Sequence, residues 1–349
     1  MGQNLEMTKA AFTRTFIFVM FALLITQCGN DGETKHLKYI AHAEWSPASN
    51  STIIISKDEH DETTGKTSGC GNDVYVEPRL PSYDIFLADT SGKIIRQITA
   101  NKGFTPPFYL RWSPDGSKFL IFGGSISTLM IVDTTGKITL TDSLGYTRDA
   151  DWSPDGSMIV CSAVRQTSII PRLYTVNPTD GQSRQIFHDS IHTGAVSWSA
   201  HNKVAFAFSS DTASKLAVID PDGSNFQLRD SGGFFNTIRW SPDGNKLLYS
   251  KRTPTQYDAY ILDILSSNSV HILRYEDNTN ISSLRFSPDG TMISYYVSNS
   301  PDKFYLYVMN VDGTNNRLIS NQSTEGSWSP DSKSIVYVYF NAVYTKRVR

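Results

Sequence analysis

The pentapeptide WSPDG occupies residues 112–116 and returns, with small changes, six more times along the chain. The other copies are WSPA at 45–48, WSPDG at 152–156, WSAHN at 198–202, WSPDG at 240–244, FSPDG at 286–290 and WSPDS at 328–332. All six tryptophans of the 349-residue chain stand at the first position of a copy, and Phe286 fills the remaining one. From Trp112 onward the copies are 40 to 46 residues apart, which indicates a structural repeat.

Each copy has the chemistry of a tight turn between two strands. In WSPDG the proline fixes φ, the aspartate bonds to the local backbone and the glycine accepts a positive φ. A strand-like run follows each copy, as in Met158–Ala163, and a later Asp-Gly or Thr-Gly turn separates a third run from a fourth. Four antiparallel strands in a unit of about 42 residues make one propeller blade. The sequence therefore predicts an all-β, seven-bladed β-propeller of four-stranded antiparallel blades, with each repeated aromatic buried between neighbouring blades.

The two ends of the repeat array are expected to meet in one blade. Only two strand-like runs follow the last copy, SIVYVYF at 334–340 and AVYTKRV at 342–348. Residues 36–41, HLKYIA, precede the first copy and have the pattern of an outer strand. We expect this N-terminal strand to complete the seventh blade, so that a propeller over residues 36–349 closes without a free sheet edge.

One repeat interval, from Trp45 to Trp112, is longer than the others at 67 residues. The excess is residues 57–83, an expected insertion between the second and third strands of the first blade, and long loops of this kind are usually functional. This loop shares a rim with the inter-blade loops, where exposed aromatic and arginine side chains favour a protein or peptide partner. The candidate anchors are Tyr75, Arg79, Phe108, Tyr109, Phe234 and Phe235. The alternative is that the phenylalanines cap blade junctions.

A second set of candidates stands directly before the repeated aromatics, where it would reach the central channel. It consists of Glu44, Arg111, Asp151, Arg239 and Arg285. These residues suit either a propeller enzyme, such as a lyase or glycan hydrolase, or polar pairing between blades. No nucleophile elbow occurs and the seven histidines lack metal-ligand spacing, so we expect no catalytic residue, metal or cofactor.

Two further features each allow a structural and a functional interpretation. The acidic run 58–62 is expected to be a solvated loop, with a calcium site as the alternative. Cys161 lies on an apolar strand and is expected to be a buried thiol, while a disulfide to Cys70 remains the alternative.

The first residues have the pattern of an export signal. Lys9 and Arg14 precede the apolar run FIFVMFALLIT at 16–26, and Cys28 follows. The segment resembles a bacterial lipobox, with Gln27 where a small residue is usual; an ordinary cleaved signal is the alternative. We expect residues 1–28 to be a signal peptide with lipidation at Cys28, and residues 29–35 to be a tether. The protein would then be exported to the periplasm or cell envelope, including the outer membrane, and held by a lipid anchor.

The repeat resembles that of the TolB propeller family, whose name-giving member is the periplasmic component of the Tol–Pal system. The resemblance covers residues 36–349, and we expect the chain to lack the N-terminal domain of that family. It implies a non-enzymatic scaffold that binds a protein or peptide, since propellers host unrelated functions and no catalytic motif stands out. The near-balance of 32 Lys+Arg against 34 Asp+Glu argues against nucleic acid as a partner.

Overall fold

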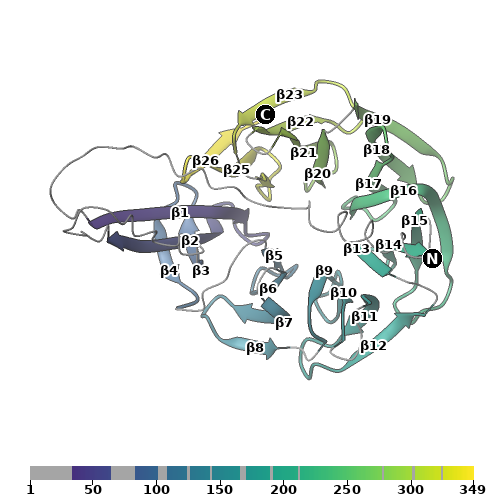
Figure 1. Cartoon of the computed structure of the whole chain (residues 1–349), viewed down its shortest axis with the longest axis horizontal. Coiled ribbons are helices and arrows are strands. Elements are labelled where there is room, and N and C mark those ends of the chain that lie inside the picture. The colour runs from purple at the N-terminus through teal and green to yellow at the C-terminus, as the bar shows by residue number, and fades with distance from the viewer. Residues whose placement is uncertain are drawn as a thin grey trace, which may run out of the picture.

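The computed structural model describes residues 34–63, 83–100, 108–123, 126–141, 144–165, 170–188, 192–210, 213–276, 279–300, 303–323 and 325–349. Within these ranges the chain forms 26 β-strands and no helix. The sheets stand side by side around a centre, as in a propeller (Figure 1). The all-β propeller of antiparallel strands that the repeats predict is therefore confirmed.

Four of the sheets have four strands each, paired antiparallel in chain order. The first contains β1 (Thr34–Trp45), β2 (Thr52–Thr63), β3 (Asp84–Asp89) and β4 (Ile94–Gln97). The second contains β5 (Phe108–Trp112), β6 (Lys118–Gly123), β7 (Ile126–Asp133) and β8 (Ile138–Thr141). The third contains β9 (Thr147–Trp152), β10 (Ile159–Ala163), β11 (Arg172–Val176) and β12 (Ser183–Phe187). A later one contains β20 (Asn280–Phe286), β21 (Met292–Ser300), β22 (Lys303–Asn310) and β23 (Arg317–Asn321).

The two remaining sheets of the described residues have seven and three strands. The larger contains β13 (His192–Trp198), β14 (Val204–Ser210), β15 (Ala213–Ile219), β16 (Gln227–Trp240), β17 (Lys246–Arg252), β18 (Gln256–Asp263) and β19 (Ser269–Glu276). The smaller contains β24 (Ser327–Trp328), β25 (Ser334–Tyr339) and β26 (Ala342–Arg347). In Figure 1, β5, β9, β13 and β20 lie near the centre of the ring, while β8, β12, β19 and β23 lie at its outside.

The expected seven separate four-stranded blades are not what the described residues form, and that prediction is wrong as stated. The reason is β16, which runs for 14 residues without a break. Its first half pairs with β15, from Gln227 to Gly233, and its second half pairs with β17, from Phe234 to Trp240. Two repeats therefore share one strand, and no loop separates them.

The expected closing strand is also wrong. Residues 36–41 belong to β1, which continues to Trp45 and pairs along its whole length with β2. The hairpin turn before Thr52 fixes this register, so the expected outer strand is the start of the inner one. Instead, β1 packs its apolar face against β25, where Ala43 and Trp45 share a cluster with Val336 and Val338.

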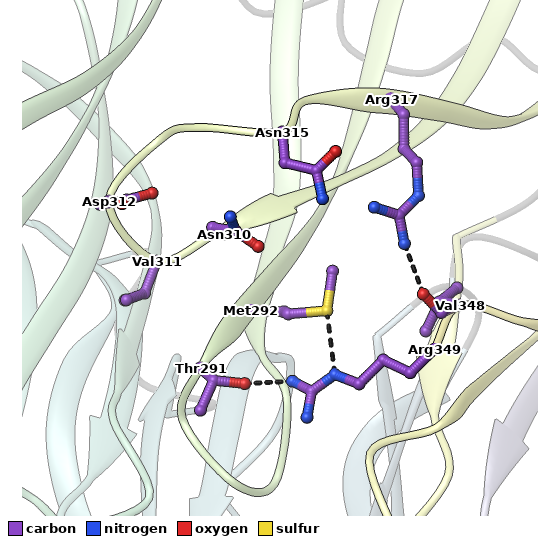
Figure 2. A pocket seen from close by; sticks show the side chains of 9 residues that line it. All are labelled: Thr291, Met292, Asn310, Val311, Asp312, Asn315, Arg317, Val348 and Arg349. Carbon is purple, nitrogen blue, oxygen red and sulfur yellow. Dashed lines mark hydrogen bonds between the residues drawn. The ribbon is translucent and has the colours of Figure 1, made fainter.

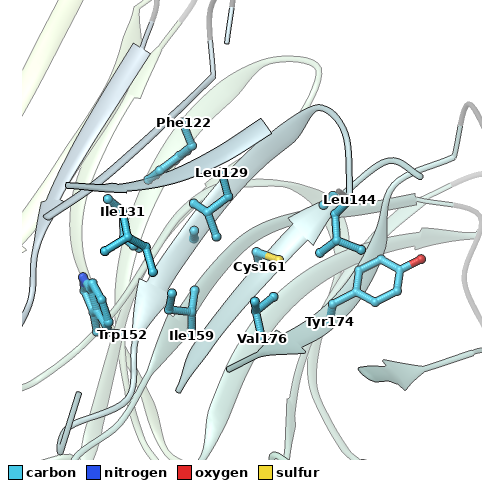
Figure 3. Close-up of a cluster of buried hydrophobic side chains, with 12 residues drawn as sticks. Phe122, Leu129, Ile131, Leu144, Trp152, Ile159, Cys161, Tyr174 and Val176 are labelled. Carbon is cyan, nitrogen blue, oxygen red and sulfur yellow. The ribbon is translucent and has the colours of Figure 1, made fainter. Parts of the chain in front are cut away.

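The repeated aromatics separate neighbouring sheets, as predicted. Five of the tryptophans are buried, whereas Trp112 and Phe286 are partly buried. Figure 3 shows the pattern at Trp152, which lies among Leu129 and Ile131 of one sheet and Ile159 and Cys161 of the next. Cys161 is buried in this cluster, as expected, while Cys70 lies outside the described residues.

The turn chemistry of the repeat is also confirmed. Asp115 accepts hydrogen bonds from Ser113 Oγ at 2.6 Å and from the Ser117 amide at 3.0 Å. Gly116 has a φ of 68°, and a Cβ there would lie 2.7 Å from Cβ of Ala48 in the neighbouring copy. The aspartate and glycine are thus fixed by the turn, which excludes these aspartates as catalytic candidates.

Candidate functional site

Seven charged side chains near the inner strands form two sets of ion pairs and one carboxylate bonded to the next sheet, and together we call them the channel belt. They are Glu44, Arg111, Asp149, Asp151, Arg239, Arg285 and Glu325. All but Glu325 lie on β1, β5, β9, β16 and β20, either directly before a repeated aromatic or three residues before it. Because alternate residues of a strand point to one face, these two positions share a face opposite the aromatic.

Glu44 lies at the centre of one half of the belt. Its Oε1 accepts a hydrogen bond from Arg285 Nη1 at 3.0 Å, and Arg285 Nη2 lies 3.9 Å from Glu325 Oε2. Burial acts to raise the pKa of Glu44, but Arg285 and His42 outweigh it and lower that pKa to about 2. Glu44 is therefore ionised although it is 8% exposed.

Two atoms beside this pair are buried without a hydrogen-bond partner among the described residues. They are Nε2 of His42 and Oε2 of Glu44, which lie 3.6 Å apart. A buried polar atom without a protein partner usually has a water or a ligand. The two atoms lie within ion-pair distance of each other, and His42 is one of the groups that lower the pKa of Glu44.

The other half of the belt is centred on Asp149. Arg111 Nη2 lies 3.8 Å from its Oδ1, and Arg239 Nη1 lies 3.8 Å from its Oδ2. Burial acts to lower the pKa of Arg111, but Asp149 and Glu44 raise it overall. Burial lowers the pKa of Arg239 to about 10, with a further contribution from the nearby Arg111. Both guanidinium groups remain charged near neutral pH.

Asp151 serves the packing between two sheets. Its Oδ2 accepts hydrogen bonds from the Trp198 amide at 3.0 Å and from Ser197 Oγ at 3.1 Å. Burial raises the pKa of this carboxyl group. Asp149 acts similarly, because its Oδ2 accepts a bond from the Val196 amide at 3.1 Å. Two of the carboxylates of the belt, those of Asp149 and Asp151, therefore hold β13 against β9.

The channel belt includes all five of the channel residues expected from the sequence, adds Asp149 and Glu325, and lies beside His42. The sequence reasoning missed His42, Asp149 and Glu325. Each stands three residues before a repeated aromatic, so the period-two pattern of a strand was the signal that could have found them.

The expected rim anchors do not form one surface within the described residues. Phe234 is 59% exposed, whereas Phe235 is 5% exposed and packs in the core beside Tyr249. Tyr109 is half-buried, with its ring centroid 5.5 Å from that of Phe122. Phe235 is therefore not an exposed anchor; it takes the alternative role of capping a junction. Tyr75, Arg79 and the side chain of Phe108 lie outside the described residues.

Part of the expected insertion is regular structure. Residues 57–63 form the second half of β2, and the acidic run 58–62 is thus in a strand and not in a loop. The rest of the insertion to residue 82 lies outside the described residues, as does Cys28. Among the residues that are described, no group of three His, Cys, Asp or Glu is placed to hold a metal ion. The same part of the chain contains no helix of the length and apolarity that crossing a membrane requires.

A pocket of about 420 Å³ lies away from the channel, between the turn after β22 and the end of the chain. Figure 2 shows its lining, with Arg317 and Arg349 on one side and Asn310 and Asn315 on the other. Arg317 donates to the carbonyl of Val348, so the pocket wall joins β23 to the residues after β26.

The repeat can now be compared with known proteins. Residues 201–340 match the family described as TolB beta propeller domain. This part of the chain is therefore similar to the TolB β-propeller domain. The Tol-Pal system protein TolB of Francisella tularensis is 23% identical over 267 residues, covering 71% of this chain and 60% of that protein. An uncharacterized protein of Agrobacterium fabrum is 27% identical over 225 residues, covering 55% of this chain and 74% of its relative.

Solved structures share the fold. An oligogalacturonate lyase in complex with manganese superposes with a TM-score of 0.64 at 16% identity, covering 91% of this chain and 98% of the lyase. A putative TolB from Agrobacterium tumefaciens superposes with a TM-score of 0.54 at 17% identity, covering 73% of the TolB-like chain and 94% of its own.

Proposed function

We propose that this TolB-like propeller is a non-enzymatic scaffold that binds a protein or peptide at the bacterial cell envelope, as a component of a Tol–Pal-related system. The family match carries the proposal, together with the name of the Francisella relative, which assigns that protein to the Tol-Pal system. That relative is longer than this chain, so the partner is inferred for the propeller alone.

The chemistry of the channel belt supports binding over catalysis. Its arginines and carboxylates are paired with one another across sheets, and Asp149 and Asp151 also accept backbone amides. A general acid or base needs a group that is free to exchange a proton with substrate. Most groups of the belt are instead held in structural pairs.

We place the partner at the rim that carries Phe234, with Tyr109 and Phe108 as separate contacts along the rim and Tyr75 and Arg79 contributed by the insertion. Phe234 lies opposite Arg252 where β16 and β17 approach the turn before Gln256. An aromatic and an arginine together are a frequent centre of protein interfaces. Loops on a rigid scaffold are also the usual place for specificity.

The envelope location rests on the N-terminal sequence. The apolar run ending at residue 26 directs export, and Cys28 carries the lipid that anchors the protein to a membrane. Replacing Cys28 by Ser and following labelled palmitate through cell fractionation tests the anchor. The lipid anchor would be contradicted if the wild-type protein takes no label and stays in the soluble fraction.

The partner site is tested with a matched pair of exposed substitutions. Phe234→Ser should abolish capture of the envelope partner by the tagged protein, with an unchanged melting temperature. Leu265→Ser is the control, because Leu265 is 88% exposed in the turn between β18 and β19 at the opposite rim. Deleting residues 60–80 should likewise abolish capture. If the folded Phe234→Ser variant and the folded deletion variant both still capture the partner, the rim is excluded as its binding site.

The second candidate function is a propeller enzyme, a lyase or glycan hydrolase, with its site in the channel. One observation favours it: Glu44 Oε2 and His42 Nε2 are buried without hydrogen-bond partners among the described residues. The oligogalacturonate lyases that share this fold supply the substrate to test, oligogalacturonate. Turnover by the wild type that is lost in Glu44→Gln would establish the enzyme; no turnover supports the scaffold.

A further inference from the structure

The three-stranded sheet differs from its four-stranded neighbours at its outer edge. In those neighbours a third strand is followed by a fourth, such as β4 after β3 or β23 after β22. The sheet of β24, β25 and β26 ends at β26, and no described strand pairs with its outer side. A strand that ends a sheet presents a row of unpaired backbone groups to solvent.

The register shows which groups these are. Val348 donates its amide to the carbonyl of Lys333 at 2.8 Å, which continues the antiparallel ladder between β25 and β26. Hydrogen-bonded positions alternate along such a pair. Counting back from Val348, the amides and carbonyls of Val343, Thr345 and Arg347 point away from β25. The edge therefore offers backbone bonding to one more antiparallel strand.

The side chains along this edge are cationic. Lys346 and Arg347 are exposed, and each makes a hydrogen bond to a backbone carbonyl, those of Ile319 and Arg349 respectively. Arg347 reaches the main-chain oxygen of the last residue of the chain, and neither side chain has an Asp or Glu partner within salt-bridge distance in the described part of the chain. Positive charge without a partner at a binding edge favours an acidic occupant.

The pocket described above extends this cationic edge. It opens beyond the end of β26 and is lined by Arg317 and Arg349 (Figure 2). Arg349 pairs with Asp289 through Nη1 at 2.5 Å, while Arg317 donates to a carbonyl and has no salt-bridge partner among the described residues. A carboxylate entering the pocket would therefore meet an arginine that is not yet neutralised.

We propose that β26 binds an extended acidic segment of a partner protein, which adds to the sheet as its fourth strand. Backbone hydrogen bonds to Val343, Thr345 and Arg347 supply affinity, and acidic side chains on the face of Arg347, with one that enters the pocket, supply specificity. This site lies on the outside of the ring and is independent of the rim proposed above.

The probe is a short fluorescent peptide that alternates Glu with Val, and its control carries Lys in place of Glu. The full-length protein should bind the Glu peptide saturably and the Lys peptide much more weakly. Thr345→Pro removes one outward amide and should weaken binding roughly tenfold. Thr345→Val is the matched control, because it loses the same hydroxyl but keeps the amide, and it should bind as the wild type does.

Arg347→Glu gives a second measurement should the proline variant fail to fold. It reverses the charge at an exposed position and should weaken binding of the Glu peptide while improving that of the Lys peptide. The proposal is overturned if the wild type binds neither peptide saturably, or if both Thr345 variants bind equally. It is also overturned if sedimentation shows a dimer that Thr345→Pro dissociates, since a second copy would then occupy the edge.

Discussion

Two junctions of the ring, one in its interior and one at its closure, are built differently. In the interior, Trp152 donates its indole N–H to the carbonyl of Arg111 in the preceding sheet at 3.2 Å. At the closure, Trp45 donates the same group to Ser49 in its own turn at 2.9 Å. The indoles of Trp152 and Trp240 thus bond across their junctions, whereas those of Trp45 and of the interior Trp198 bond within their own turns.

The glycine turns between third and fourth strands show the same difference. A Cβ on Gly136 would lie 2.4 Å from the carbonyl oxygen of Ile98, at the end of the preceding sheet's outer strand. A Cβ on Gly92 would instead lie 2.9 Å from Cβ of Val343, on the third strand of the last sheet. Where no fourth strand is described, side-chain packing replaces backbone contact. The closure therefore depends on a few polar links, among them the ion pair of Glu44 with Arg285 and the buried bond from the Trp45 amide to Ser327.

The largest effect is expected at the interior junction. Trp152→Ala should lower the free energy of unfolding by about 3–5 kcal/mol, because it leaves a cavity between two sheets and an unpaired carbonyl. Trp112→Ala should cost less, since Trp112 is partly buried and its indole nitrogen has no partner among the described residues. Chemical denaturation of both variants measures the difference, and equal losses would contradict the interior role of Trp152.

The next effect concerns the link across the closure. Arg285→Leu leaves the buried carboxylate of Glu44 without its cation and should cost about 3 kcal/mol. The double variant Arg285→Leu with Glu44→Leu should recover part of this loss, because no isolated charge remains. Denaturation of the four members of this cycle gives the coupling energy. Additive losses would show that the pair does not hold the closure.

Acid should weaken the closure before the interior. The pKa of Glu44 is about 2 in the folded protein and 4.5 when unperturbed, so its contribution is complete above pH 4.5 and is lost as pH falls towards 2. Hydrogen exchange should therefore show β25 losing protection over this range ahead of β10. In Glu44→Gln this pH-dependent loss should be smaller. An unchanged acid profile in that variant would assign the effect to other carboxylates.

The contrast between local and distant interactions also explains what the sequence predicts well. The Ser-Pro-Asp-Gly turns and the buried aromatics follow from chemistry within a few residues, and the structure confirms both. The course of β16 and of β1 depends instead on which strands pair, and no local signal separates a continuous strand from two strands with a loop. Pairing also explains the strand at 57–63, which lacks an apolar face.

The register of β1 and β2 gives the physical reason for that strand. Lys35 stands opposite Glu62 and Lys38 stands opposite Glu59. The acidic run is therefore paired along its length with the start of β1, although by itself it suggests a loop. The channel belt also depends on distant pairing. The ion-pair partners of Asp149 are Arg111 and Arg239, which lie 38 and 90 residues away along the chain.

The smallest expected effect isolates a single bond of the closure. Ser327 directly precedes Trp328 and accepts the amide of Trp45 at 3.0 Å, as Asp151, directly before Trp152, accepts the amide of Trp198. Ser327→Ala leaves the Trp45 amide buried and unpaired and should cost about 1 kcal/mol. Asp151→Ala should cost more, because that carboxylate accepts a second bond.

Hydrogen exchange separates this loss from a general one. In Ser327→Ala the Trp45 amide should exchange faster while the Trp198 amide keeps its protection, and Asp151→Ala should reverse the two. A hydroxyl acceptor is weaker than a carboxylate, so the closing junction should already exchange faster in the wild type. Equal protection of the two amides in the wild type would mean that packing of β1 against β25 holds the ring as firmly as the bonded interior junctions.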